Sequence, residues 1–165
     1  SRPWALTGTP GLEHRIGGLE KWDETGHVSY DPDNHNYMVK LRQQKVDIIS
    51  DSFKETEVYG KESGELLVLG WGGTYGAIRS AVQRARVEKK SVAHIHLRNL
   101  NPFPRDLGEK LVKYEKVLIP ELNLGQLNSI IRSKYLIDTE SLNKVEGKPF
   151  TPSEIYSSIN KIIKG

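Results

Sequence analysis

Cysteine is absent from all 165 residues. Without a thiol, the chain cannot build a disulfide framework, supply thiolates to zinc or to an iron–sulfur cluster, or use a cysteine nucleophile. Long apolar runs are missing too, so no segment is long enough to cross a bilayer, and no signal-peptide pattern opens the sequence. We therefore expect a soluble, cytoplasmic protein with no membrane partner.

A large excess of charge of one sign is also lacking. The 24 Lys and Arg residues nearly balance the 21 Asp and Glu residues, which leaves a formal net charge of +3. Nucleic-acid modules usually carry a clustered basic surface and a much higher charge. We therefore expect no nucleic-acid partner.

Apolar residues are scarce, above all at the start of the chain. Counted with glycine and without tyrosine they make up about 41% of the sequence, against about 45–50% in an average domain. Residues 1–33 are punctuated too densely by glycine and proline for regular structure, yet they carry Trp4 and Trp22. We predict that residues 1–33 form an extended arm that docks on a partner, and that the chain is a piece of a longer protein.

The rest of the sequence divides into a helix and an alternating region. Helical spacing over residues 34–54 predicts a connecting helix. Over residues 55–165, short aliphatic runs alternate with helical patterns, which is typical of βαβ units. The pattern predicts an α/β fold in which helices cover both faces of a mainly parallel sheet. Strands are predicted at 58–59, 66–69, 92–97, 117–119 and 142–145, and helices at 75–88, 105–114, 125–135 and 153–163.

A glycine-rich loop follows the first long strand and precedes a predicted helix. It reads Gly70-Trp71-Gly72-Gly73-Thr74. Amides at a helix N-terminus can hold an anion, but the spacing matches neither the dinucleotide-binding fingerprint nor a P-loop. The competing explanation is structural: glycine lets the helix pack close to the strand, and Thr74 caps the helix.

A second polar loop, residues 121–126 with the sequence ELNLGQ, ends the third long strand. In a doubly wound sheet, loops at the carboxyl ends of strands beside the switch point line a crevice. Glu121, Asn123 and Gln126 are therefore predicted to face the glycine loop there and to contact a ligand or a partner subunit. The alternative is that Asn123 only caps the next helix and that Glu121 is solvated.

Histidines form no metal site with recognisable spacing. His94 and His96 alternate on one strand and share a face, but no third ligand accompanies them. His14, His27 and His35 are mixed with acidic residues in a pattern that fits no template. We predict that the chain holds no metal.

Several strings resemble the α subunits of 2-oxoacid:ferredoxin oxidoreductases, most of all the 2-oxoglutarate type. The resemblance covers essentially the whole chain. In the arm it is carried by SRPW at 1–4, GTPGLEH at 8–14, GGLE at 17–20 and YDPDNH at 30–35. Further along it is carried by LGWGGT at 69–74, LRNLNPFP at 97–104 and ELNLGQL at 121–127.

The resemblance implies a fold similar to the transketolase C-terminal domain: a three-layer α/β/α sandwich with a five-stranded sheet, in which residues 58–59 form an antiparallel edge strand. It also implies a reaction. Family members decarboxylate a 2-oxoacid oxidatively with thiamine diphosphate and magnesium, reduce ferredoxin through iron–sulfur clusters, and release an acyl-CoA. This chain lacks cysteine and the Gly-Asp-Gly thiamine motif. It is therefore expected to bind none of these cofactors alone, to have no catalytic residue of its own and to be inactive in isolation.

The resemblance further implies partners and one substrate contact. The expected partners are the β subunit, the remainder of the α subunit and, through the complex, ferredoxin; we also consider a homodimer of this chain. Family members place an arginine near the substrate carboxylate, and Arg2 is the nearest match. Guanidinium groups bind carboxylates through two parallel hydrogen bonds. The competing hypothesis from the residues alone is a free-standing α/β module that binds a small ligand or anion at residues 70–74.

Overall fold

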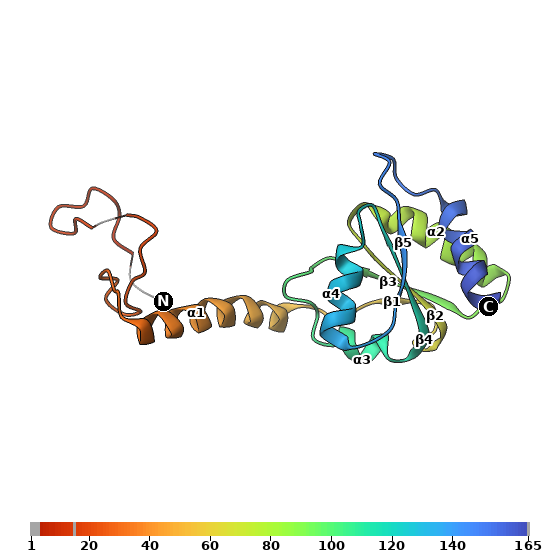
Figure 1. Ribbon diagram of the computed structural model, residues 1–165, viewed down its shortest axis with the longest axis horizontal. Helices are drawn as coiled ribbons and strands as arrows, with labels where there is room; N and C mark the ends of the chain where they lie inside the picture. The colour runs from red at the N-terminus through yellow and green to blue at the C-terminus, as the bar shows by residue number, and fades with distance from the viewer. Residues whose placement is uncertain (1–3, 15, 165) are drawn as a thin grey trace. The chain divides into compact units, whose positions relative to one another are not determined.

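The computed structural model describes residues 4–14 and 16–164. The chain divides into two compact units between Ile49 and Ser50. The second unit contains a five-stranded sheet, and the first contains a long helix with the segment that precedes it (Figure 1). No helix within the described residues has the length and apolar character needed to span a membrane.

The sheet has the strand order β1-β3-β2-β4-β5. β1 pairs antiparallel with β3, and the other pairings are parallel. Its central strand owes its place to a continuous aliphatic run: residues 66–69 are fully buried, as expected of a strand covered on both faces. The strands are β1 Val58–Tyr59, β2 Gly64–Trp71, β3 Val92–Leu97, β4 Tyr114–Glu121 and β5 Glu140–Asn143.

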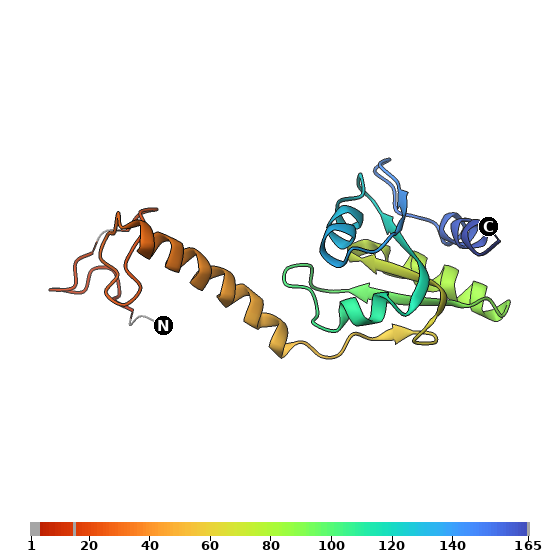
Figure 2. The same ribbon diagram turned by 60° about the horizontal axis from the view of Figure 1, so that its bottom comes forward.

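Helices cover both faces of this sheet (Figures 1 and 2). Side chains alternate along β2, so Leu66 and Val68 join a core with α2 and α5, while Leu67 and Leu69 join a second core with α3 and α4. The helices are α2 Tyr75–Val87, α3 Leu107–Leu111, α4 Gln126–Tyr135 and α5 Pro152–Lys164. The predicted three-layer α/β/α sandwich with a mainly parallel five-stranded sheet is confirmed, including the antiparallel edge strand.

Two details differ from the sequence prediction. β2 and β4 extend beyond their aliphatic centres, because strand pairing continues into the polar residues at their ends. β5 lies at Glu140–Asn143, two residues earlier than predicted. α5 starts as its sequence indicates: the Glu154 amide donates to Thr151 Oγ1, and the Thr151 amide donates to the Glu154 carboxylate, which is a capping box.

The first unit is organised around α1, Pro32–Asp47, which is followed by the 3₁₀ helix η1, Ile48–Ser52. Asp31 caps α1 by accepting a hydrogen bond from the Asn34 amide at 2.7 Å, and Pro32 occupies the first helical turn. The helix therefore begins two residues before the apolar spacing predicted, because its capping signal precedes that pattern. The α-helical part also ends earlier, at Asp47.

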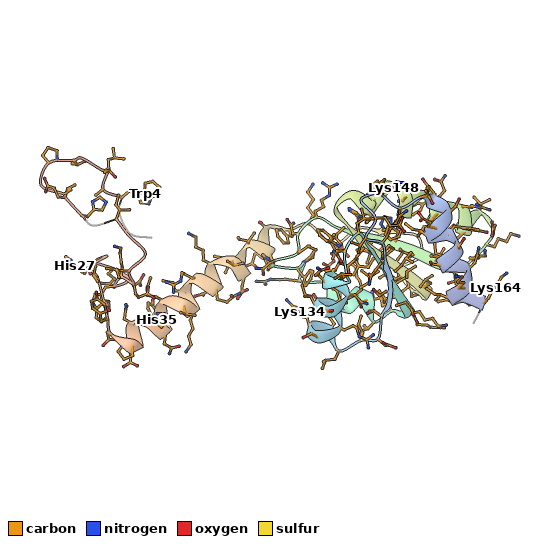
Figure 3. All side chains as sticks on the ribbon, turned by 45° about the horizontal axis from the view of Figure 1, so that its top comes forward. Trp4, His27, His35, Lys134, Lys148 and Lys164 are labelled. Carbon is orange, nitrogen blue, oxygen red and sulfur yellow. The ribbon has the colours of Figure 1, made fainter. Side chains whose placement is uncertain are left out.

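Residues 20–29 fold into a turn that is fastened to α1. The Ser29 amide donates to the Glu20 carbonyl, and Lys21 and Val28 form an antiparallel bridge. The Glu20 carboxylate accepts two hydrogen bonds from the Arg42 guanidinium, at 3.0 and 3.3 Å, and contacts His35 Nδ1 at 2.7 Å. Figure 3 shows His35 on the first turns of α1. Part of the segment that the glycines and prolines marked as irregular thus has polar anchors in the following helix.

We expect the titration of Glu20 to report this anchoring. The hydrogen bonds from Arg42, then that with His35, lower the pKa of Glu20 to about 2, from an ordinary value near 4.5. Because the folded pKa is depressed, the contribution of the anchor is fully present above the ordinary value and is lost as pH falls through about 2. Carboxyl carbon shifts measured by NMR should therefore give a midpoint near 2.

Arg42→Gln should raise the Glu20 midpoint toward its ordinary value. Glu154 offers an internal control in the other unit, since Lys144 and Thr151 lower its pKa to about 2 as well. Its midpoint should stay unchanged in the variant. An unshifted Glu20 midpoint in Arg42→Gln would show that the guanidinium does not hold this carboxylate in solution.

Candidate functional site

The candidate site is the region at the carboxyl ends of β2 and β4. These strands are parallel neighbours at the centre of the sheet. The chain leaves β2 toward β3 on one side and leaves β4 toward β5 on the other. This reversal is the switch point at which open α/β sheets bind ligands, and the two loops singled out in the sequence meet there.

Glu121 is the centre of this region and is fully buried, with 0% of its surface exposed. Its Oε1 accepts hydrogen bonds from the Leu127 amide at 2.9 Å and from Trp71 Nε1 at 3.4 Å, and its Oε2 accepts one from the Asn128 amide at 2.9 Å. Asn123 Nδ2 donates to Oε1 at 3.1 Å. The carboxylate thus satisfies free amides in the first turn of α4, where negative charge is favoured.

The alternative of a solvated Glu121 is therefore wrong. The N-cap residue of α4 is Gly125, which makes no side-chain cap bond, and Asn123 instead binds the amides at the entry to the helix. Asn123 Oδ1 accepts from the amides of Gly125, at 2.8 Å, and Gln126, at 3.3 Å. Gly125 has a φ of +91°, a conformation that glycine adopts at little cost. Gln126 is exposed at the start of α4.

The glycine loop folds as the short 3₁₀ helix η2, Gly72–Thr74, directly before α2. Thr74 is buried, and its hydroxyl donates to the Trp71 carbonyl at 2.8 Å and accepts from the Trp71 amide at 3.3 Å. The side chain makes no capping bond to α2. The expected cap is replaced by a bond that closes the loop itself, because the hydroxyl points back to the end of β2.

The glycines of this loop have different roles. A Cβ on Gly70 would lie 2.4 Å from Ile78 Cδ1 and 3.1 Å from both His96 Nδ1 and Thr74 Oγ1. Close packing of α2 on the strand therefore explains this glycine. Gly72 and Gly73 have open space where a Cβ would lie, so packing explains neither of them.

Two exposed leucines of the second loop were missed by the sequence analysis. Leu124 is 79% exposed and Leu122 is 40% exposed, on either side of Asn123. The alternation of leucine with polar residues in ELNLG was the available signal, since the polar residues turn inward to the Glu121 network. The loop thus presents apolar side chains to its surroundings.

His94 and His96 point to the α2 face, where their rings and that of Tyr75 form a cluster with centroids 5.0–5.7 Å apart. Burial, with a smaller effect of His96 and Arg79, lowers the pKa of His94 to about 3, so its ring is neutral at pH 7. His94 Nε2 and His96 Nδ1 are buried without hydrogen-bond partners in the described structure. No group of three or more His, Cys, Asp or Glu residues within residues 4–14 and 16–164 is placed to hold a metal ion. Arg2 lies outside the described residues.

Comparison with known proteins identifies the class to which this fold belongs. The family model of the pyruvate:ferredoxin oxidoreductase core domain II matches residues 64–155, and the chain belongs to that family. The α-subunit resemblance found in the sequence is confirmed by a curated relative. The 2-oxoglutarate oxidoreductase subunit KorA of Mycobacterium tuberculosis is 50% identical over all 165 residues of this chain, which span 25% of its own length.

Solved structures agree on the fold. The 2-oxoglutarate:ferredoxin oxidoreductase of Magnetococcus marinus, solved with 2-oxoglutarate, coenzyme A and succinyl-CoA, superimposes with a TM-score of 0.87 at 34% identity. The match covers 98% of this chain and 28% of that chain. A split-gene transketolase matches 68% of this chain and 43% of its own, with a TM-score of 0.52 at 16% identity, which shows the shared fold. The chain thus spans about a quarter of the length of the Mycobacterium tuberculosis and Magnetococcus marinus proteins.

We expect Gly70→Ala to destabilise the second unit by about 1–3 kcal/mol, because the added methyl group overpacks the contact between β2 and α2. Gly73→Ala is the matched control: it adds the same methyl group, three residues later, into open space. Urea unfolding of both variants checks this. Equal unfolding midpoints would contradict the assignment of close packing to Gly70.

Glu121→Gln should lower the free energy of unfolding by about 1–3 kcal/mol, since an amide has one acceptor oxygen where the carboxylate has two, and bonds to charged acceptors are the stronger ones. Glu140→Gln on β5 is the control, because Glu140 is exposed and its change should stay within about 0.5 kcal/mol. Chemical denaturation followed by tryptophan fluorescence gives both values. If Glu121→Gln leaves the free energy of unfolding unchanged, the hydrogen bonds from the four donors do not depend on the negative charge of the carboxylate.

Proposed function

We propose that this chain is a structural and subunit-contacting portion of the α subunit of a 2-oxoacid:ferredoxin oxidoreductase. The complete enzyme would convert a 2-oxoacid such as 2-oxoglutarate to an acyl-CoA with reduction of ferredoxin. The observation that carries this proposal is the 50% identity with the 2-oxoglutarate oxidoreductase subunit over the whole chain. The shared fold of the 2-oxoglutarate:ferredoxin oxidoreductase at a TM-score of 0.87 supports it.

The cofactors of such an enzyme would be held outside this chain. Iron–sulfur clusters need thiolates, and the sequence has no cysteine. Thiamine diphosphate is held through magnesium, which needs oxygen ligands. The described residues offer no cluster of acidic and histidine side chains for a metal ion. Thiamine diphosphate, magnesium and the clusters are therefore assigned to other parts of the complex. Coenzyme A is assigned to the complete enzyme by analogy with the Magnetococcus marinus protein.

Exposed apolar side chains support a role in assembly. In the first unit, Trp4 is 93% exposed, and Leu6 and Ile16 are similarly open to solvent. In the second unit, Leu122 and Leu124 project from the loop that Glu121 fixes. Burying one large apolar side chain contributes about 1.5–3 kcal/mol. We assign both surfaces to contacts with the remainder of the α subunit and with the β subunit, and we place the assembled enzyme in the cytoplasm.

Individual site residues take roles consistent with this geometry. Gly72 and Gly73 are exposed after β2, Gln126 is exposed at the start of α4, and Trp71 links the two loops through Glu121. We assign Glu121, Asn123 and Thr74 to positioning the loops rather than to touching a partner. Contact of Arg2 with the substrate carboxylate, interaction with ferredoxin, and a homodimer of this chain stay predictions.

The test is reconstitution. The complete α subunit, purified with its β subunit, should reduce ferredoxin in a reaction that requires a 2-oxoacid and coenzyme A, and the 165-residue chain alone should show no turnover. Leu124→Ser in the complete α subunit should weaken assembly with its neighbours by about 10-fold or more, because an exposed loop leucine would lose its apolar contact. Subunit titration by analytical ultracentrifugation measures this.

Leu136→Ser is the matched control, since Leu136 is 90% exposed at the far end of α4, and it should leave assembly unchanged. A complex that turns over no 2-oxoacid would refute the proposed activity. Normal assembly of Leu124→Ser would refute only the contact assigned to this loop.

A further inference from the structure

A concave site lies at the opposite end of the sheet from the candidate site. A cavity of about 270 Å³ is bounded by the loop before β2, the turn after α2 and the first residue of β4. These are the amino ends of the parallel strands. The turn that follows α2 lies at the right-hand end of the sheet domain in Figure 2.

The cavity wall carries an uncompensated positive charge. Lys61, Arg86, Lys89 and Lys90 all line it. Of these, Lys90 has a carboxylate partner, Glu88 Oε2 at 2.7 Å, whereas the other three form no ion pair with any residue of the described ranges. No carboxylate lines the cavity. Glu62, next to Lys61 in the sequence, is not a lining residue, but it lies near enough to Tyr114, which does line the cavity, to contribute to raising its pKa.

Several of these groups are held in place by the surrounding fold. Arg86 Nη1 donates to the Val92 carbonyl at 3.2 Å, and its guanidinium lies over the Tyr59 ring. One of its five N–H donors is thereby engaged. The Tyr114 hydroxyl donates to the Lys61 carbonyl at 2.7 Å, which fixes the backbone of Lys61 beside β4. The Ser91 hydroxyl accepts from the Glu65 amide and keeps its own proton to donate.

Lys89 occupies a position where lysine is disfavoured. Its φ is +63°, and the turn is closed by bonds from the Lys89 amide to the Arg86 carbonyl and from the Lys90 amide to the Ala85 carbonyl. This is the helix C-terminal motif in which glycine or asparagine is usual at the left-handed residue. A lysine here costs stability relative to glycine, so its presence calls for a reason other than the fold.

The favourable interaction of cations with the dipole of α2 does not explain why all of these cations line the cavity. Cations near a helix C-terminus are favourable, which explains Arg86 and part of the role of Lys89. Lys61 comes from a different loop, and the three cations together repel one another unless an anion lies between them. The serine hydroxyls on the same wall add hydrogen-bond donors that dipole complementation does not need.

We infer that this cavity is a binding site for a phosphate group, distinct from the proposed subunit contacts. A phosphate carries up to two negative charges at neutral pH and several strong acceptor oxygens. These match the three cations without a carboxylate partner and the neighbouring hydroxyls. A carboxylate supplies one charge and two oxygens. The volume suits inorganic phosphate or the phosphate end of a small phosphorylated metabolite, the remainder of which extends into solvent.

The test is an NMR titration of the full 165-residue chain with inorganic phosphate and with pyrophosphate, at constant ionic strength maintained with potassium chloride. The changes in amide chemical shift should be saturable and centred on residues 61–63, 86 and 89–91. Half-saturation by phosphate should fall at about 1 mM, and pyrophosphate should bind more tightly. Lys61→Gln and Lys89→Gln should each weaken binding by about 5-fold or more. Citrate and a phosphorylated sugar, titrated in parallel, distinguish a polycarboxylate ligand from a phosphorylated metabolite.

Lys89→Gly separates binding from folding. It removes the cation and relieves the left-handed backbone, so phosphate binding should weaken while the urea midpoint stays equal or rises. Lys148→Gln is the control, because Lys148 (labelled in Figure 3) follows β5 at the other end of the sheet and should bind phosphate as the parent does. Non-saturating shifts, equal weakening by Lys148→Gln, or binding of citrate without phosphate would each overturn the proposal.

Discussion

The candidate site depends on a single carboxylate that has no contact with solvent. Glu121 ends β4, receives the first amides of α4 and holds the indole of Trp71 at the end of β2. Every donor to it in the described structure is an N–H group of an uncharged partner, so the charge is stabilised by hydrogen bonds and by the helix dipole. Removing that charge would free two strands and one helix from their common point. The exposed leucines beside it keep their directions only while this network holds.

The sheet keeps its two candidate binding regions apart. At the carboxyl ends of β2 and β4, Glu121 and Asn123 are hydrogen-bonded within the loops. The exposed groups there include two leucines, glycine backbone and Gln126, a mixture that suits contact with protein. At the amino ends, cations from two loops surround a small cavity without a carboxylate. One end is thus suited to assembly and the other to a small anion, and the buried central residues of β2 and β4 lie between them.

The fold could be predicted from the sequence because buried strands and helices require apolar residues at characteristic positions. The run at residues 66–69 is aliphatic on both faces, so it predicts a central strand, and the helices between such runs fix the layers. The site was less predictable. The local sequence does not show whether a glutamate is solvated or buried. It also does not distinguish Gly70, which packs against Ile78, from Gly73, which faces open space. The turn at residues 20–29 depends on Arg42, and the cationic cavity depends on Lys61 and Lys89. Pairings between distant segments such as these are not recorded in local spacing.

The sheet ends on both sides in very short strands. β1 has two residues and runs antiparallel to its neighbour, and β5 has four, beginning with the charged Glu140. An outer strand this short offers few free amides and carbonyls to another chain, and a charge on it disfavours stacking of edges. If subunits separate or are made in unequal amounts, the domain therefore lacks a long edge through which copies could polymerise into extended β-structure.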